Sequence, residues 1–238
     1  MKTLKSTIIL LLVVLIGINT NTFAGNRDET ENRKIQNFNA IKVSTGIDLY
    51  LTMGNSEEVK IVADDDIIDN LITEVKDGTL RIYMKKTNWF NWGNFNQTRK
   101  AYVTVKELEK IDASSGSDVE TENTLKGESL EIEASSGSDV NLDIVYKNVS
   151  LSTSSGSDAK LTGKAKYFEA SASSGSDITA RNFETEYCKV KASSGSDITV
   201  NVSEEITAKA SSGADIRYYG NPKIKDTDES SGGDIVHR

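Results

Sequence analysis

Residues 172–178, Ala172-Ser173-Ser174-Gly175-Ser176-Asp177-Ile178, contain the motif that decides the fold of this 238-residue chain. The motif Ser-Ser-Gly-Ser-Asp, or a near variant, occurs seven times in the C-terminal half. Successive motif glycines are 21, 19, 19, 20, 18 and 19 residues apart, and they are Gly116, Gly137, Gly156, Gly175, Gly195, Gly213 and Gly232. A period of this length, with one turn motif in each unit, is typical of coils that stack into a rod.

Apolar and polar residues alternate on both sides of each motif. The apolar position before the motif is occupied by Ile111, Ile132, Leu151, Ala170, Val190 and Ala208. The apolar position after it is occupied by Val119, Val140, Ala159, Ile178, Ile198 and Ile216. Alternation with a period of two predicts strands with one face inward, stacked in parallel at about 4.8 Å per coil. We therefore predict an all-β, parallel right-handed β-helix-like solenoid of roughly eight or more coils, the hand following the general preference of parallel crossovers.

The segment before the repeats contains a diverged copy and an insertion. Residues 44–49 align with the later motifs and form the diverged copy. We expect strands at residues 59–63 and 80–84, a short helix or turn at residues 67–72, and a tight turn at Asp77-Gly78. We predict a flexible leader over residues 25–37, a solenoid domain over 38–222 with repeats from 106 and a loop insertion at 87–100, and a last coil and tail over 223–238.

Residues 1–24 have the pattern of a secretory signal peptide. Lys2 and Lys5 precede an unbroken apolar run at residues 8–16, and the segment ends at Ala24. This pattern predicts export to the periplasm or the cell surface, with cleavage after Ala24. The apolar run is too short for a comfortable membrane span, so we expect no transmembrane segment in the mature chain.

The charge and the cysteine content restrict the partners and the source of stability. The chain has 28 Lys and Arg against 36 Asp and Glu, and removing Lys2 and Lys5 leaves a net charge of 26 − 36 = −10. A chain this negative disfavours nucleic acid as a partner. The one cysteine, Cys188, excludes an internal disulfide, so ladder hydrogen bonds and packing must stabilise the rod.

Three stretches together resemble the head GIN domain family of auto-transporter adhesins. They are residues 38–49 (FNAIKVSTGIDL), 74–82 (EVKDGTLRI) and 103–105 (VTV), and the Ser-Gly-Asp repeats follow them. The resemblance covers about residues 38–220. It implies a right-handed, parallel β-helix-like domain exported into the envelope of Gram-negative bacteria, with a role in adhesion and no catalytic residues.

The aspartates of the motif are expected to stack in register along one edge of the rod. They are Asp118, Asp139, Asp158, Asp177, Asp197 and Asp215, followed by Asp234, with Asp48 as a further member. In the structural interpretation, each carboxylate accepts hydrogen bonds at its turn while glycine supplies a positive φ. In the alternative interpretation, the row binds Ca²⁺ between coils, because Ca²⁺ prefers oxygen ligands. The structural interpretation needs no cofactor.

Four large aromatic residues cluster in the loop insertion, and they are Trp89, Phe90, Trp92 and Phe95. Aromatic side chains beside asparagine are suited to stacking on sugars or to a protein-binding hot spot. The alternative is that they cover an open edge of the solenoid. We take these four residues as the candidate ligand-binding site, with an envelope glycan or protein as the unidentified partner.

The sequence shows no combination of residues that would pair a nucleophile with its base or supply a set of metal ligands. The only histidine, His237, is next to the C-terminus, so the repeated serines have no evident base, and stacked hydroxyls at a tight corner explain them better. Cys188 lies in a row of apolar residues, so we expect its thiol to be buried. We therefore predict a non-enzyme that acts in adhesion or envelope interaction. The alternatives are a polysaccharide-active β-helix enzyme and a cation-stabilised structural or assembly protein.

Overall fold

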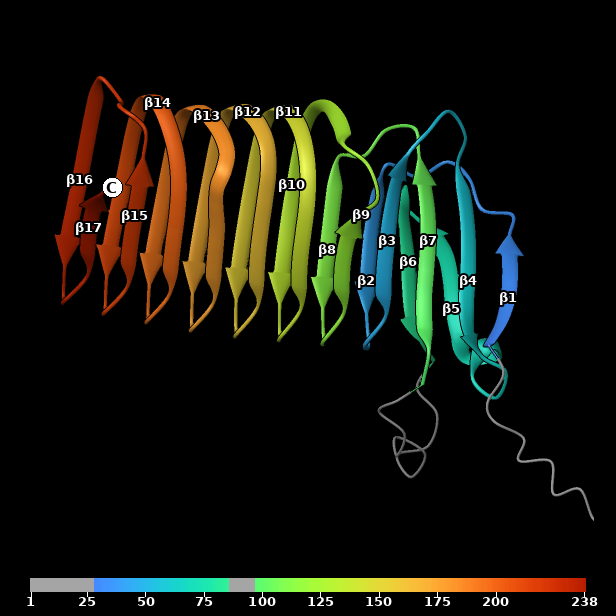
Figure 1. Ribbon diagram of the computed structural model, residues 1–238. Coiled ribbons are helices and arrows are strands. Elements are labelled where there is room, and N and C mark those ends of the chain that lie inside the picture. Colours follow the sequence, from blue (N-terminus) through green and yellow to red (C-terminus); the bar gives the residue numbers. More distant parts are fainter. Residues whose placement is uncertain (1–27, 86–96) are drawn as a thin grey trace, which may run out of the picture.

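The structure is a computed structural model that describes residues 28–85 and 97–238. These residues form a β-solenoid of about 7 turns with parallel stacked strands (Figure 1). The predicted all-β, parallel solenoid is confirmed, with slightly fewer turns than the eight or more expected. Its right-handed sense stays a prediction. Each coil is flattened, with two strands on opposite sides of the rod and a tight Ser-Gly turn at one edge (Figure 1).

The strands before the turns form one face of the rod, here the pre-turn face, and those after the turns form the post-turn face. The pre-turn face includes β2 (Ala40–Ser44), β8 (Lys110–Ser114), β10 (Leu125–Ser135) and β16 (Ile224–Ser230). The post-turn face includes β3 (Asp48–Met53), β9 (Asp118–Thr121), β15 (Asp215–Tyr219) and β17 (Asp234–His237). Four long strands bend around the edge opposite the turns and belong to both faces, namely β11 (Asp139–Ser154), β12 (Asp158–Ser173), β13 (Asp177–Ser193) and β14 (Asp197–Ser211).

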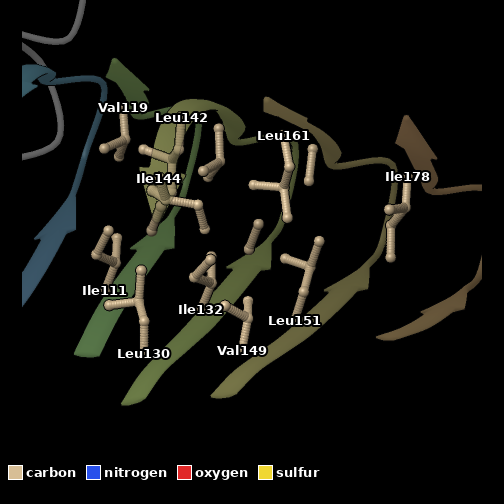
Figure 2. Packing of buried hydrophobic residues seen from close by; sticks show 14 of the residues in the cluster. Ile111, Val119, Leu130, Ile132, Leu142, Ile144, Val149, Leu151, Leu161 and Ile178 are labelled. Atoms are coloured by element: carbon tan, nitrogen blue, oxygen red, sulfur yellow. The ribbon is translucent and has the colours of Figure 1, made fainter. Parts of the chain in front are cut away.

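The core lies between the two faces and consists of the predicted apolar rows. Successive strands pair so that Val140 lies beside Ala159, and Ala159 beside Ile178. The two predicted apolar rows are buried in every coil from Ile111 to Ile216. Figure 2 shows the labelled side chains of both rows pointing into the space between the faces. The alternation in the sequence therefore predicted correctly which residues point inward.

The tight turn has two residues with a positive φ. Ser174 has a φ of 58° and Gly175 a φ of 67°, and the other six motif turns have the same pair of left-handed residues. The positive φ predicted for the glycine is confirmed, and the serine before it adopts the same region. Two successive left-handed residues reverse the chain as in a type I′ turn.

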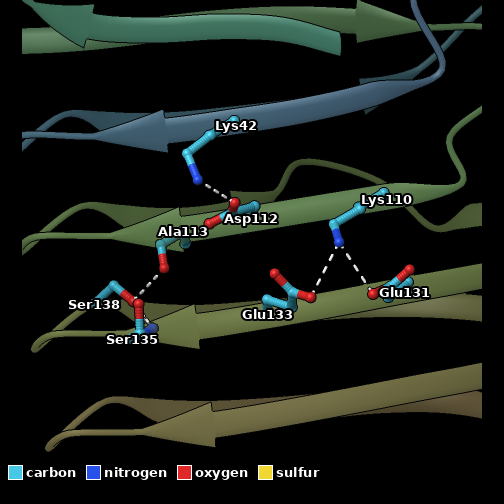
Figure 3. A network of polar contacts seen from close by, with 8 residues as sticks. All are labelled: Lys42, Lys110, Asp112, Ala113, Glu131, Glu133, Ser135 and Ser138. Atoms are coloured by element: carbon cyan, nitrogen blue, oxygen red, sulfur yellow. Dashed lines mark hydrogen bonds and ion pairs between the residues drawn. The ribbon is translucent and has the colours of Figure 1, made fainter. Parts of the chain in front are cut away.

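In five of the seven motifs a buried serine follows the glycine, and it links neighbouring coils. The Ser157 hydroxyl is fully buried, accepts a hydrogen bond from the Ser154 N–H (3.1 Å) and donates to the Ala134 carbonyl of the preceding coil (2.8 Å). Ser138 makes the corresponding contacts with Ser135 and Ala113 (Figure 3). These bonds place the serine after the glycine at the corner of the coil, and the stacking of hydroxyls predicted for the serines before it stays a prediction.

The first coils are stacked out of sequence order. β6 (Thr79–Met84) and β7 (Arg99–Val105) pair in parallel with β2 and β3, on the side away from the repeats. β4 (Glu58–Asp64) is antiparallel to β7, and β5 (Leu71–Lys76) is antiparallel to β6 after the 3₁₀ turn η1 (Ile68–Asn70). The predicted strands, short helix and Asp77-Gly78 turn are present, but they extend the rod at its N-terminal end.

Part of the expected flexible leader is a strand. β1 (Asp28–Arg33) is antiparallel to β4, which differs from the prediction of a flexible segment over residues 25–37. The Arg33 guanidinium donates to the Leu71 carbonyl (2.5 Å), the Thr73 hydroxyl (3.1 Å) and the Ile68 carbonyl (3.3 Å). These bonds connect β1, on the post-turn face, to the first residues of β5, on the pre-turn face. The polar composition of residues 25–37 gave no indication that part of this segment forms a strand.

Charged edge strands end the rod on both sides. All seven residues of β16 are exposed, and Lys225, Thr227 and Glu229 occupy the register positions of the inward row of β14. At the other end, β1 carries Asp28, Glu29 and Glu31. Charged side chains on an edge strand discourage pairing with another chain. β1 and β16 are therefore poorly suited to pairing with a strand of another chain.

Candidate functional site

A groove of about 640 Å³ runs along the pre-turn face, across the five strands β10 to β14. Its lining comes mainly from two outward rows, each with one residue per strand. One row is Ser129, Asn148, Tyr167, Tyr187 and Glu205, and the other is Glu131, Ser150, Glu169, Lys189 and Thr207. Five strands about 4.8 Å apart span about 20 Å along the rod. This pre-turn groove is thus long and narrow.

Two tyrosines form an aromatic patch in the pre-turn groove. The Tyr167 and Tyr187 rings stack with their centroids 5.1 Å apart and an interplanar angle of 22°. Tyr167 is 43% exposed, and it is one of only three exposed large hydrophobic residues in the described part of the chain. The Lys166 ammonium lies 5.2 Å from the Tyr167 ring centre. An exposed aromatic surface in a groove is typical of a recognition site.

Several of the charged side chains around the pre-turn groove are joined in ion pairs. Lys110 contacts Glu131 and Glu133, both at 3.0 Å (Figure 3), and Lys189 contacts Glu169 at 2.8 Å. The contact with Lys110 lowers the pKa of Glu131, and the bonds with the two glutamates raise the pKa of Lys110. Exposed pairs of this kind add little stability. Neutral hydroxyl and amide groups lie beside these pairs on β10 and β11.

Buried residues lie beneath the pre-turn groove. Phe168 packs edge-on against Phe183, with centroids 5.2 Å apart. Cys188 is buried, as expected from its apolar row, and burial raises the pKa of its thiol to about 12. A thiol with this pKa is protonated at neutral pH and is a poor nucleophile. Cys188 therefore belongs to the core.

The motif aspartates stack in register, as predicted. They are Asp118, Asp139, Asp158, Asp177, Asp197 and Asp215. The Asp158 carboxylate accepts a hydrogen bond from the Asp177 N–H (3.1 Å), and Asp177 accepts one from the Asp197 N–H (3.0 Å). These contacts support the structural interpretation. Within residues 28–85 and 97–238, no three His, Cys, Asp or Glu side chains form a group suited to a metal ion. Calcium binding stays a hypothesis.

Replacing Asp118 with asparagine is expected to raise the urea midpoint of unfolding at pH 7. Desolvation, with the charges of Asp139 and Asp48, raises the pKa of Asp118. Ionised Asp118 therefore destabilises the fold at a pH above its raised pKa, and the penalty disappears below the ordinary aspartate pKa. The rise in the urea midpoint caused by Asp118→Asn should therefore be present at pH 7 and absent at pH 3.

Asp197→Asn is the matched control with the opposite sign, because the Asp197 carboxylate contacts the Arg217 guanidinium at 3.1 Å. This variant should lower the midpoint at pH 7 slightly. A lower midpoint for Asp118→Asn would contradict the account of the aspartate row.

The aromatic cluster predicted as a ligand-binding site, Trp89, Phe90, Trp92 and Phe95, lies outside the described residues. β6 ends at Met84 and β7 begins at Arg99, and both ends lie beside the Ser44–Asp48 corner of the coil β2–β3. The two strand ends that flank the insertion therefore lie at the edge of the rod that carries the tight turns. The role of the four aromatic residues stays a prediction.

The tyrosines of the pre-turn groove were not predicted as a site, although the sequence contains a signal for them. Tyr167 lies eight residues before Gly175, and Tyr187 lies eight residues before Gly195. Aligning the repeats on their glycines thus places both residues in the same outward row. Because the repeats contain few aromatic residues, two tyrosines at the same repeat position indicate an aromatic row on the surface.

Comparison with known families agrees with the architecture. The family model described as "Putative auto-transporter adhesin, head GIN domain" matches residues 37–222. The chain belongs to this family. A search of curated proteins gives no match for this head GIN domain protein. Its described residues include no helix with the length and apolar character needed to cross a membrane.

Solved structures share the fold of this head GIN domain protein. A "putative adhesin" from Bacteroides fragilis NCTC 9343 is 25% identical, with a TM-score of 0.84, and the match covers 90% of this chain and 98% of that one. A "putative adhesin" from Parabacteroides merdae ATCC 43184 is 18% identical, with a TM-score of 0.70 and coverage of 88% and 96%. A "putative lipid binding protein" from Parabacteroides distasonis ATCC 8503 is 21% identical, with a TM-score of 0.68 and coverage of 90% and 98%. The last two show the fold alone.

Proposed function

We propose that the chain is an exported, non-enzymatic adhesion module of a Gram-negative cell envelope, located in the periplasm or at the cell surface. The family supports a role in adhesion. The signal-peptide pattern of residues 1–24 supports export. The observation that carries the proposal is the pre-turn groove, because it places two rows of outward side chains, with one residue of each row per coil, on a solenoid scaffold. Binding residues on such a scaffold are held in place before the ligand arrives.

The carboxylates of the pre-turn groove are poorly suited to polysaccharide cleavage. A glycosidase of the usual kind pairs a carboxylate with a carboxylic acid whose pKa is raised. The Lys110 contact instead lowers the pKa of Glu131, and Glu169 is paired with Lys189. His237, which is the only histidine, stacks on Tyr218 outside the groove. These features favour binding without turnover.

The proposal is tested by a binding screen with residues 25–238. The chain is immobilised and exposed to Gram-negative envelope fractions, to a glycan array and to polysaccharides whose cleavage is followed by reducing ends. We expect saturable binding without cleavage, and the urea-unfolded chain serves as the control. Turnover of any polysaccharide, or no saturable binding to any envelope component, would overturn the proposal.

The same screen compares the two candidate surfaces. A Trp89→Ala, Trp92→Ala variant removes both tryptophans of the aromatic cluster and changes no residue of the groove. If the cluster is the binding site, this variant should lose binding while its melting temperature stays nearly unchanged. Retained binding combined with a lower melting temperature would instead assign the two tryptophans a structural role.

A further inference from the structure

We propose that the pre-turn groove binds a neutral glycan chain that lies along the rod axis, an inference that rests on the adhesion function proposed above. Each coil from β10 to β14 contributes one residue to each of the two rows of the groove, because the strands pair in register at these positions. The groove extends about 20 Å along the rod. Outward positions that recur along the rod can contact successive units of a polymer.

The charges around the groove disfavour an acidic ligand. The Glu131 and Glu169 carboxylates are bound by Lys110 and Lys189, at 3.0 and 2.8 Å, whereas Glu109 and Glu205 line the groove outside the ion pairs of the described residues. An acidic polymer would have to break the two pairs and would meet the like charge of the other carboxylates. Ser129, Asn148 and Ser150, which lie among them, carry hydrogen-bonding groups without charge. Hydroxyl and amide groups both donate and accept hydrogen bonds, as sugar hydroxyls require.

The tyrosine pair supplies the apolar contact that a sugar ring needs. Tyr167 and Tyr187 stack at 5.1 Å and occupy the same row as Asn148. An aromatic ring has an electron-rich face and a large apolar area, and the C–H groups of a sugar ring can pack against it. The groove thus combines an aromatic patch two coils long with polar side chains on the preceding coils, and this combination orients a glycan along the row.

The post-turn face offers a matched comparison. Tyr50 and Tyr102 stack in register with centroids 4.9 Å apart and an interplanar angle of 17°. The Lys60 ammonium lies 4.2 Å from the centre of the Tyr102 ring, and neither tyrosine lines the groove. A stacked tyrosine pair therefore also exists without the groove, and the two pairs can be removed separately.

The experiment measures the binding of residues 25–238 to neutral oligosaccharides derived from glucan, mannan, xylan and chitin. Alginate and polygalacturonate oligosaccharides are the acidic counterparts, and envelope proteins form a further arm. We expect binding to at least one neutral oligosaccharide. Tyr167→Ser with Tyr187→Ser should weaken that binding at least about tenfold, which is a loss of about 1.4 kcal/mol. Tyr50→Ser with Tyr102→Ser should leave the affinity unchanged.

A second variant keeps both tyrosines in place. Ser150 lies between Glu131 and Glu169 in its row, so the side chain of Ser150→Arg is expected to pair with both and to cover the groove. This variant should also weaken binding to neutral oligosaccharides by at least about tenfold, which gives an independent result if the tyrosine variant fails to fold.

The outcomes separate this inference from the proposed function. Binding only to acidic oligosaccharides or to envelope proteins would overturn the neutral-glycan inference and leave the adhesion function standing. Equal binding by the wild type and the Ser150→Arg variant would exclude the groove as the site. Binding to no oligosaccharide and no envelope component would overturn both proposals.

Discussion

Replacing Gly163 with alanine is expected to lower the free energy of unfolding by about 3 kcal/mol or more. Gly163 has a φ of 103°, and a Cβ at this position would lie 2.1 Å from the Ile144 carbonyl oxygen and 3.0 Å from its carbon. The contacted atoms are backbone atoms of the neighbouring coil, so a side-chain movement cannot relieve the clash. In thermal unfolding followed by circular dichroism, the melting temperature should fall by about 10 °C.

Gly175→Ala is the matched control for Gly163→Ala. Gly175 also has a positive φ, 67°, but a Cβ there would meet no atom within 4 Å. Only the left-handed backbone then opposes the substitution, at a cost of about 1 kcal/mol. Equal melting temperatures for the two variants would contradict the close approach of coils at the bend opposite the tight turns.

Replacing Phe168 with alanine is expected to cost about 3–5 kcal/mol of stability. The side chain is 2% exposed and contacts Phe183 edge-on. Its row neighbours, Val149 and Cys188, are smaller and cannot fill the cavity. Urea unfolding followed by tyrosine fluorescence or circular dichroism should show a clearly lower midpoint with an unchanged slope.

Tyr167→Ser tests the adjacent position. Tyr167 is 43% exposed, so its replacement should change the midpoint of unfolding much less than Phe168→Ala does. Two neighbouring aromatic residues are thus assigned opposite roles, one in the core and one in the groove. If Tyr167→Ser lowers the midpoint as much as Phe168→Ala does, Tyr167 belongs to the core and the groove loses its exposed aromatic residue.

The regular part of the rod was predictable because each coil repeats the same local chemistry. The alternation around Gly175 assigns Ile178 to the core, and the period places Asp158, Asp177 and Asp197 in one row. Each of these assignments needs only the side-chain period of a strand and the spacing of the turns. The structure has all of them in register.

The N-terminal end could not be predicted from the same pattern. β6 and β7 are stacked outside β2 and β3 although they follow them in sequence. This order depends on pairing between distant strands, and no local motif encodes it. The Arg33 contacts with Leu71 and Thr73 likewise bring together residues about 40 positions apart. A polar leader sequence therefore gave no sign that β1 would be ordered.

The pre-turn groove was predictable in part. The common eight-residue spacing of Tyr167 and Tyr187 from their glycines identifies an aromatic row. The spacing does not reveal that Glu169 is bound by Lys189, or that Glu131 is bound by Lys110, because side-chain geometry decides which charges meet. Which carboxylates of the groove are paired is therefore visible only in the structure.

A crystal structure of residues 25–238 soaked with the neutral oligosaccharide that binds best tests the central claim most directly. The account predicts stacked Tyr167 and Tyr187 rings about 5 Å apart, which is the spacing of neighbouring strands. It also predicts electron density for sugar rings along the groove, beside Asn148 and Ser150. Sugar density elsewhere on the rod with an empty groove, or strands in another register, would contradict the account.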